Sequence, residues 1–284
     1  MIQRIIRSVA NRSRTASKSI RWRFASNRKD YGQIVFVLGC QRSGTTLLMN
    51  CFDQDRRARV FRDDSALTGF RGNRLRLKPY REVERILAKC RSPLVVSKPL
   101  LDSQLAGEIL SEYPRSKAIW MFRNYRGVIG SSLKKFSSQV ESIRRVVDQP
   151  DDWRGERVHH RTIEFIKPFV SSNMRREDAA ALIWIARNQL FFNQSFDSSK
   201  LVSVLNYEDL VNSSDDALRG IYGFLELDFP VYSITHSIHQ NSLVRGQGIE
   251  IDATIEKACR ALQRRLHQCV AFNTQSQSLS EDNS

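Results

Sequence analysis

Residues 33–46 read QIVFVLGCQRSGTT, and this stretch decides the fold. Its first part, residues 34–38, is a continuous apolar run rich in β-branched side chains, which is typical of a strand buried on both faces. Gly39 ends the run, a Gly/Ser/Thr turn follows, and residues 47–52 have the composition of a helix. The order is therefore strand, tight loop and helix, which is the first unit of an α/β fold.

Similar apolar runs recur along the chain, with helical patterns between them. The runs lie at residues 94–96, 118–122 and 201–205, and the helical patterns lie at about 80–90, 102–112, 126–139, 176–195, 214–225 and 252–271. Short strands that alternate with helices predict the α/β class, with a central parallel sheet flanked by helices in three layers.

Length and composition limit the organisation of the chain. With 284 residues, 41% of them hydrophobic, the chain can bury one sizeable core. We expect one domain over residues 31–272, a basic flexible leader at 1–30 and a disordered tail at 273–284. There is no apolar run of about 18 residues, so we expect no transmembrane segment. The five scattered cysteines match no zinc or disulfide spacing, so we expect a cytoplasmic protein without a metal site.

The charge is strongly positive and unevenly distributed. The chain has 45 Lys and Arg against 30 Asp and Glu, a net charge of +15. Residues 1–30 carry nine basic residues and one acidic residue, so about half of the excess lies in the leader. This leader could be a flexible arm, a membrane-surface anchor or a targeting peptide. The composition alone admits nucleic acid, an acidic membrane surface or a polyanionic small molecule as partner.

The loop at residues 39–46 has the features of an anion site. A glycine-bearing turn between a strand and a helix directs several backbone N–H groups at one point, and the helix N-terminus adds a partial positive charge. Ser43, Thr45 and Thr46 add hydroxyl donors, and Arg42 adds a permanent charge. The sequence therefore predicts that this loop binds a phosphate or a sulfate.

The glycine spacing matches the nucleotide-triphosphatase motif GxxxxGK[ST], but Thr45 stands at the lysine position, which disfavours ATP or GTP hydrolysis. Residues 41–48, QRSGTTLL, instead resemble the 5′-phosphosulfate loop of sulfotransferases that use 3′-phosphoadenosine 5′-phosphosulfate (PAPS). The resemblance is closest to the arginine-bearing branch, with its Golgi-type, tyrosylprotein and bacterial members. It implies a P-loop-kinase-like sulfotransferase fold and transfer of a sulfuryl group from PAPS, without a metal, to an acceptor hydroxyl. It also implies that the nucleotide is bound by Arg42, Ser43, Gly44, Thr45 and Thr46.

Later segments extend this resemblance as far as Gly248. Arg123 follows an apolar strand and Ser131 lies eight residues beyond it, as in the family's pair of ligands to the 3′-phosphate, although Ser132 is a neighbouring alternative. Tyr207 begins YEDL, and a tyrosine there lies near the adenine in the family. The segment VRGQG, with Arg245 and Gly246, is similar to a late arginine–glycine segment that adds contacts to the 3′-phosphate. An ordinary glycine-rich loop is the alternative for it.

The resemblance also supplies candidates for catalysis, together with Arg42. Lys98 follows the second apolar run, where family members place a lysine close to the transferring group. The arginine-loop branch uses a carboxylate about 20 residues after the arginine as general base. Asp63 and Asp64 lie 21 and 22 residues after Arg42, and we favour Asp63. The alternative is that both aspartates cap the following segment.

The sequence does not name the acceptor. A small molecule or a glycan is expected, with no nucleic acid as partner, peripheral membrane contact through residues 1–30 and an undetermined oligomeric state. The segment 136–175 carries arginines that would suit an anionic acceptor or form a solvated face: Arg144, Arg145, Arg154, Arg157 and Arg161. The alternatives in function are a nucleotide-dependent kinase on a related scaffold, or a non-enzymatic basic protein that associates with membranes or nucleic acid.

Overall fold

A computed structural model describes residues 18, 31–71, 74–149, 152–236, 238 and 248–281, with backbone alone at 71 and 271–281. Apart from residue 18, the leader at 1–30 lies outside the described residues, as do Arg245 and Gly246.

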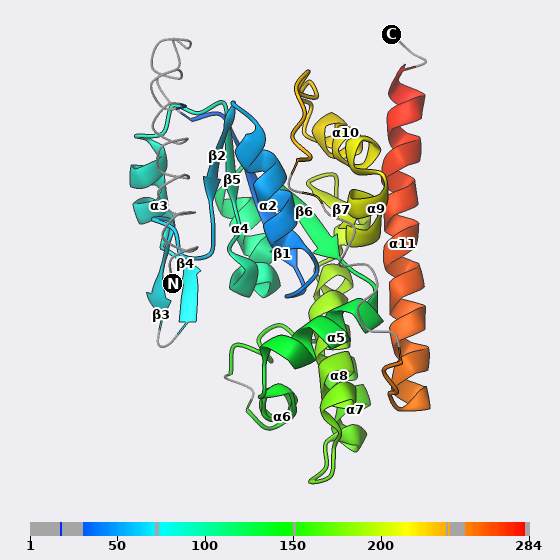
Figure 1. Cartoon of the computed structure of the whole chain (residues 1–284). Helices are drawn as coiled ribbons and strands as arrows, with labels where there is room; N and C mark the ends of the chain where they lie inside the picture. The colour runs from blue at the N-terminus through cyan, green and yellow to red at the C-terminus, as the bar shows by residue number, and fades with distance from the viewer. Residues whose placement is uncertain are drawn as a thin grey trace.

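A parallel five-stranded sheet forms the centre of the molecule (Figure 1). The strand order is β2-β5-β1-β6-β7, with bounds β1 Gln33–Gly39, β2 Ala58–Phe61, β5 Leu94–Ser97, β6 Ser116–Phe122 and β7 Val202–Asn206. Every adjacent pair is parallel, so all carboxyl ends lie at one edge. The predicted parallel sheet is confirmed. The sequence missed β2, because Arg59 interrupts its apolar pattern.

The central strand β1 lies at the point where the chain changes direction across the sheet. Its neighbours are β5 on one side and β6 on the other, with Val35 beside Val96 and Phe36 beside Ala118. The chain first builds β2 and β5 on one side of β1 and then crosses to build β6 and β7. In open parallel sheets, ligands bind beyond the carboxyl ends at such a switch point.

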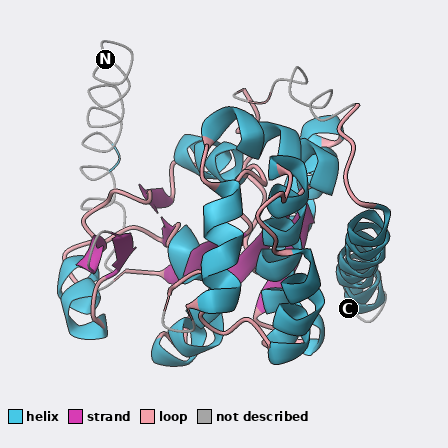
Figure 2. Cartoon of the chain, turned by 90° about the horizontal axis from the view of Figure 1, so that it is seen from below, coloured by secondary structure: helices cyan, strands magenta, loops and turns pink. Residues whose placement is uncertain are grey.

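Helices cover both faces of the sheet (Figure 2). One face packs against α2 Thr45–Gln54, α9 Tyr207–Asn212 and α10 Ser214–Phe224. The other packs against α3 Tyr80–Leu87, α4 Ala106–Glu112, α8 Arg176–Asn193 and α11 Ala253–Glu281. Alternate residues of β1 enter the two cores, since Val35 and Val37 face α2 while Phe36 and Leu38 face the opposite helices. This double burial is why the run at 34–38 is apolar at every position.

A second group of elements lies beyond the carboxyl edge of the sheet. It comprises α5 Tyr125–Lys135, α6 Gln139–Asp148, α7 His160–Ile166 and the first part of α8, in the lower half of Figure 1. A small antiparallel hairpin, β3 Thr68–Arg71 and β4 Arg74–Leu77, precedes α3. Short 3-10 segments complete the chain: η1 Leu100–Leu105, η2 Lys167–Phe169 and η3 Phe196–Ser198.

Three details differ from the sequence predictions. The helix predicted at 126–139 is α5, which ends at Lys135, and a separate helix, α6, begins at Gln139. The pattern at 102–112 begins as the 3-10 segment η1 and becomes α-helical only at Ala106. Helix α11 continues to Glu281, past residue 273 where the sequence placed the start of the tail. None of the helices in the described part combines the length and the apolar character needed to cross a bilayer.

Candidate functional site

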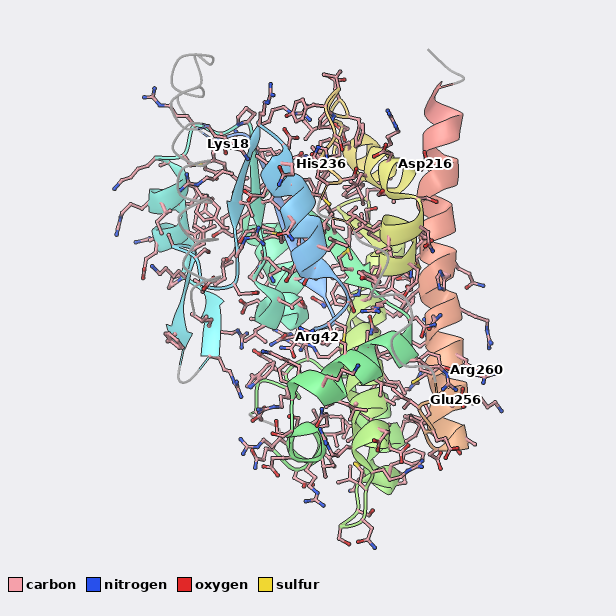
Figure 3. All side chains as sticks on the ribbon, in the orientation of Figure 1. Lys18, Arg42, Asp216, His236, Glu256 and Arg260 are labelled. Atoms are coloured by element: carbon pink, nitrogen blue, oxygen red, sulfur yellow. The ribbon has the colours of Figure 1, made fainter. Side chains whose placement is uncertain are left out.

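The loop after β1 has a backbone suited to anion binding. Gly44 is the N-cap of α2 with φ 90°, and Arg42 has φ 69°, in the left-handed region that is unfavourable for residues other than glycine. Because Gly44 offers no side chain to cap the helix, the amides of Thr45 and Thr46 remain available to an outside acceptor, whereas the Leu47 amide donates to the Gly44 carbonyl at 2.8 Å. Figure 3 places Arg42 below α2, on the side that faces α5.

Tyr207 packs against this loop, and Arg123 packs on Tyr207. The Arg123 guanidinium lies 4.2 Å from the centre of the Tyr207 ring, and a Cβ added at Gly44 would overlap that ring. Arg123 comes from the end of β6 and Tyr207 from the end of β7, so the two neighbouring strands bring these motifs together. Arg123 and Tyr207 are both almost fully buried.

Ser131 contacts Arg42. The Nε of Arg42 donates to the Oγ of Ser131 at 3.0 Å, which ties the loop after β1 to α5. Ser132, the alternative to Ser131, lies on the wall of a second, neighbouring cavity. The 5′-phosphosulfate loop and the 3′-phosphate motif of the resemblance are thus in direct contact through one hydrogen bond.

Lys98 lies at the carboxyl end of β5 and joins the loop to the candidate base. Its Nζ donates to the Thr46 hydroxyl at 3.2 Å and forms an ion pair of 2.6 Å with the Asp63 carboxylate. The Lys98 side chain is 6% exposed and that of Asp63 is 49% exposed. The ion pair therefore joins a buried lysine to a carboxylate that solvent or a ligand can reach. The structure separates the two aspartates, since Asp64 is exposed and does not line the cavity.

These side chains surround one cavity of about 840 Å³ at the carboxyl edge of the sheet. Its wall is made by Gln41, Arg42, Gly44, Thr45, Thr46, Leu47, Asp63, Thr68, Phe70, Arg74, Leu75, Lys98, Pro99, Leu100, Leu101, Arg123, Ser131, Phe136 and Tyr207. Four of these side chains are cationic and one is a carboxylate. The cavity therefore favours a ligand with several negative charges.

One residue of the predicted loop does not reach this space. Ser43 is fully buried and absent from the cavity wall, so its hydroxyl is not positioned as a ligand donor in the way the sequence predicted. Thr45 is 4% exposed but does line the cavity, and Thr46 is exposed.

Glu208 connects the segments that follow β6 and β7. Its carboxylate accepts from the Asn124 amide at 3.3 Å and from the Asn206 side chain at 3.0 Å, and lies 3.7 Å from the Arg123 Nε. Glu208 thus links the ends of β6 and β7 and holds the segment that carries Arg123.

The sequence missed the part of the cavity wall that comes from the hairpin. Phe70 and Arg74 lie on β3 and β4, which the apolar runs did not reveal. The available signal was the Gly-Asn pair at 72–73 between short alternating segments, a turn composition typical of hairpins.

The Cys40 thiol, within the loop, is free and buried. Burial raises the pKa of Cys40 to about 12, against smaller opposing effects of Arg187 and Ser43, so the thiol is protonated at neutral pH. Within the described residues, no group of His, Cys, Asp and Glu side chains is arranged to hold a metal ion.

Comparison with solved structures identifies the fold. The sulfotransferase domain from the curacin biosynthetic pathway superposes with a TM-score of 0.53 at 15% identity, covering 82% of this chain and 98% of that one. The protein has a sulfotransferase fold. The expected fold is therefore confirmed, although no family model and no curated protein matches the sequence.

Two further sulfotransferases give lower scores. The enzyme from Alicyclobacillus acidocaldarius has a TM-score of 0.45 at 12% identity, covering 86% of this chain and 95% of that one. The mouse sulfotransferase SULT7A1, solved with PAP (adenosine 3′,5′-bisphosphate), has a TM-score of 0.36 at 14% identity, covering 84% of this chain and 65% of that one.

Proposed function

We propose that this protein transfers a sulfuryl group from PAPS to an acceptor hydroxyl. The observation that carries the proposal is that the loop after β1, with Arg42 and Lys98, and the segment with Arg123 and Tyr207 line one cationic cavity. PAPS carries anionic groups at both its 5′ and its 3′ positions, so it needs two anion sites a nucleoside apart. The sulfotransferase fold supports this assignment.

The loop would hold the 5′-phosphosulfate and the second segment the 3′-phosphate. The amides of the first turn of α2 and the Thr46 hydroxyl can donate to the phosphosulfate oxygens, and Arg42 adds its charge. Arg123 would meet the 3′-phosphate, and Tyr207 would pack near the adenine. Ser131 accepts from the Arg42 Nε at the junction of the two sites, and its O–H can donate to a phosphate oxygen.

The reaction would proceed by in-line displacement at sulfur. The acceptor oxygen forms a bond to sulfur as the Asp63 carboxylate removes its proton. The bond from sulfur to the bridging oxygen breaks, and its electron pair stays on that oxygen, which leaves as part of PAP. Lys98 lies beside both Asp63 and the loop, so it can stabilise the negative charge on the leaving oxygen.

Positioning and positive charge would supply most of the rate, as in phosphoryl transfer. The kinase alternative has less support, because Thr45 occupies the position of the lysine that reaches the terminal phosphates of a nucleoside triphosphate.

Calorimetric titration with PAP and with adenosine 5′-monophosphate tests the assignment of Arg123. We expect Arg123→Ala to weaken the binding of PAP by about ten- to a hundredfold, since charge-assisted hydrogen bonds to the 3′-phosphate are lost. Binding of the monophosphate should weaken much less. Arg161→Ala, which removes an exposed arginine on α7, is the matched control and should change neither affinity. Equal weakening of both nucleotides by Arg123→Ala would contradict the assignment. Transfer of label from ³⁵S-PAPS to acceptors tests the reaction itself.

A further inference from the structure

A second cavity of about 200 Å³ branches from the main one. The two cavities share Gln41, Arg42, Arg74, Leu101 and Phe136 in their walls. The branch extends between α5, α6 and α8, away from the segment with Arg123 and Tyr207, neither of which lines it. Its position therefore suits the acceptor rather than the adenosine.

Most of the branch wall is apolar. Val128 of α5, Val146 of α6, and Ile183 and Trp184 of α8 contribute side chains to it. Phe136, between α5 and α6, is 39% exposed and stands where the branch meets the main cavity. Phe70, 74% exposed, adds a second phenyl ring to the wall of the main cavity. Exposed phenyl rings on a cavity wall favour an apolar ligand body.

The branch also contains a buried cation. Arg187 of α8 is 7% exposed, and its guanidinium donates to the Gln104 side chain at 3.1 Å and to the Leu100 carbonyl at 3.5 Å. Within the described residues, no carboxylate lies at ion-pair distance from Arg187. The nearby Asp102 and Glu156 are instead engaged by Arg76.

The charge of Arg187 thus lies in an apolar wall with only neutral partners. Burial lowers the pKa of this guanidinium, which reflects the cost of keeping its charge out of water. Two neutral acceptors use two of its five N–H donors. A buried charge of this kind is stabilised when an anion binds beside it.

Three arginines surround the indole of Trp153 in the branch. The guanidinium carbons of Arg154, Arg74 and Arg187 lie 4.9, 5.2 and 6.0 Å from the ring centre. Asp152 neutralises Arg154 at 2.7 Å, whereas in the described part of the chain no carboxylate pairs with Arg74 or Arg187. The Trp153 Nε1 and the Arg74 Nε are buried and meet no acceptor among the described residues. These two N–H donors on the branch wall can therefore hydrogen-bond to an acceptor group of a ligand.

We propose that the acceptor is an alcohol with an apolar body and a carboxylate, and that the carboxylate binds in the branch beside Arg187, Arg74 and Trp153. Its hydroxyl then lies in the main cavity near Asp63. A carboxylate fits better than a phosphate dianion, because the branch is small, mostly apolar and close to Asp102 and Glu156. This inference rests on the proposed sulfuryl transfer, since the branch is assigned to the acceptor.

Binding of matched acid and amide probes tests the inference without turnover. The probes are ω-hydroxyalkanoic acids from hydroxyhexanoic to hydroxydodecanoic acid and the corresponding primary amides, titrated into the full chain saturated with PAP. We expect at least one acid to bind about ten- to a hundredfold tighter than its amide, the effect of charge-assisted hydrogen bonds. Arg187→Gln and, separately, Arg74→Gln should each reduce this preference by about tenfold. Arg161→Gln removes an exposed charge of α7 that does not line the branch, and should keep the preference.

Two results would overturn the inference. One is that each acid binds no better than its amide to the wild-type protein, including the case in which none of the probes binds. The other is that both Arg187→Gln and Arg74→Gln retain the full preference. Arg74 is half-buried, so its variant remains informative if loss of the buried Arg187 prevents folding. Failure of the proposed function is distinguishable, because it would appear first as failure of the wild-type protein to bind PAP.

Discussion

At the scale of single residues, Gly44 is a position in the loop where a side chain would be strained. It has φ 90°, and a Cβ there would overlap the Tyr207 ring. We expect Gly44→Ala to lower the free energy of unfolding by about 1–3 kcal/mol through strain and to weaken PAP binding. Urea unfolding and calorimetry measure the two effects. Gly220→Ala is the control, since a Cβ there meets nothing within 4 Å and alanine favours helix α10. A fully stable Gly44→Ala protein with normal PAP affinity would contradict the role given to the loop.

Asp63 and Asp64 form a natural pair of variants. Asp63 lines the cavity and pairs with Lys98, whereas Asp64 is exposed outside it. If Asp63 is the general base, Asp63→Asn should lower the rate of sulfuryl transfer by about 10²–10⁴-fold with PAP affinity nearly unchanged. Asp64→Asn should behave as wild type. Single-turnover rates with labelled PAPS decide this, and an unchanged rate in Asp63→Asn would mean that another group is the base.

At the scale of elements, Asp55 secures the end of α2. It is the C-cap of that helix and is fully buried in the side chain. Its carboxylate accepts from the Arg57 guanidinium at 2.9 Å, from the Tyr222 hydroxyl at 2.7 Å and from the Tyr232 hydroxyl at 3.1 Å. These contacts join α2 to α10 and to the segment that follows it.

The protonation of Asp55 should make stability depend on pH. Burial alone would raise the pKa of Asp55, but hydrogen bonds from Arg57 and Tyr222 outweigh burial and hold this pKa below its usual value. A depressed carboxyl pKa stabilises the folded state above the unfolded pKa of about 4, and this contribution is lost as pH falls through the folded value.

We therefore expect Asp55→Asn to cost about 2–4 kcal/mol of unfolding free energy at pH 7, and progressively less as the pH falls below about 4. Urea unfolding at a series of pH values measures the difference. Asp216→Asn, at an exposed position in the first turn of α10, is the control and should change stability little at any pH. A difference between wild type and Asp55→Asn that stays constant down to pH 3 would rule out the titration of Asp55 as its source.

At the scale of the whole molecule, nucleotide binding should stabilise the fold by linkage. The cavity is built from β1, β5, β6 and β7 together, so a bound nucleotide holds strands from both sides of the sheet. At a PAP concentration about a hundred times its dissociation constant, the gain is about 2.7 kcal/mol. For a domain of this size we expect a rise in Tm of roughly 5–10 °C. Thermal unfolding with PAP, and separately with ATP and Mg²⁺, measures it. Stabilisation by ATP and Mg²⁺ but not by PAP would favour the kinase alternative.

The strands that were predicted correctly share one property. β1, β5, β6 and β7 are buried almost throughout, so burial imposes an apolar residue at most positions and leaves a visible run. β2 contains Arg59, and the hairpin strands contain Arg74 and Arg76, because their side chains reach solvent, a cavity or a buried ion pair. Such strands do not produce an apolar run, and the sequence did not reveal them.

The sequence by itself determined the local chemistry of the loop after β1 and its place between a strand and a helix. The glycines and hydroxyl residues of the loop are close together in the sequence, so they indicate an anion-binding turn without any long-range contact. Only the tertiary structure decided that Arg42 bonds Ser131, that Asp63 rather than Asp64 meets Lys98, and that Ser43 is buried. The branch around Arg187 and Trp153 also follows from the tertiary structure and not from the local sequence. These contacts join residues tens of positions apart, and their distances depend on how helices pack beyond the sheet, which no local pattern encodes.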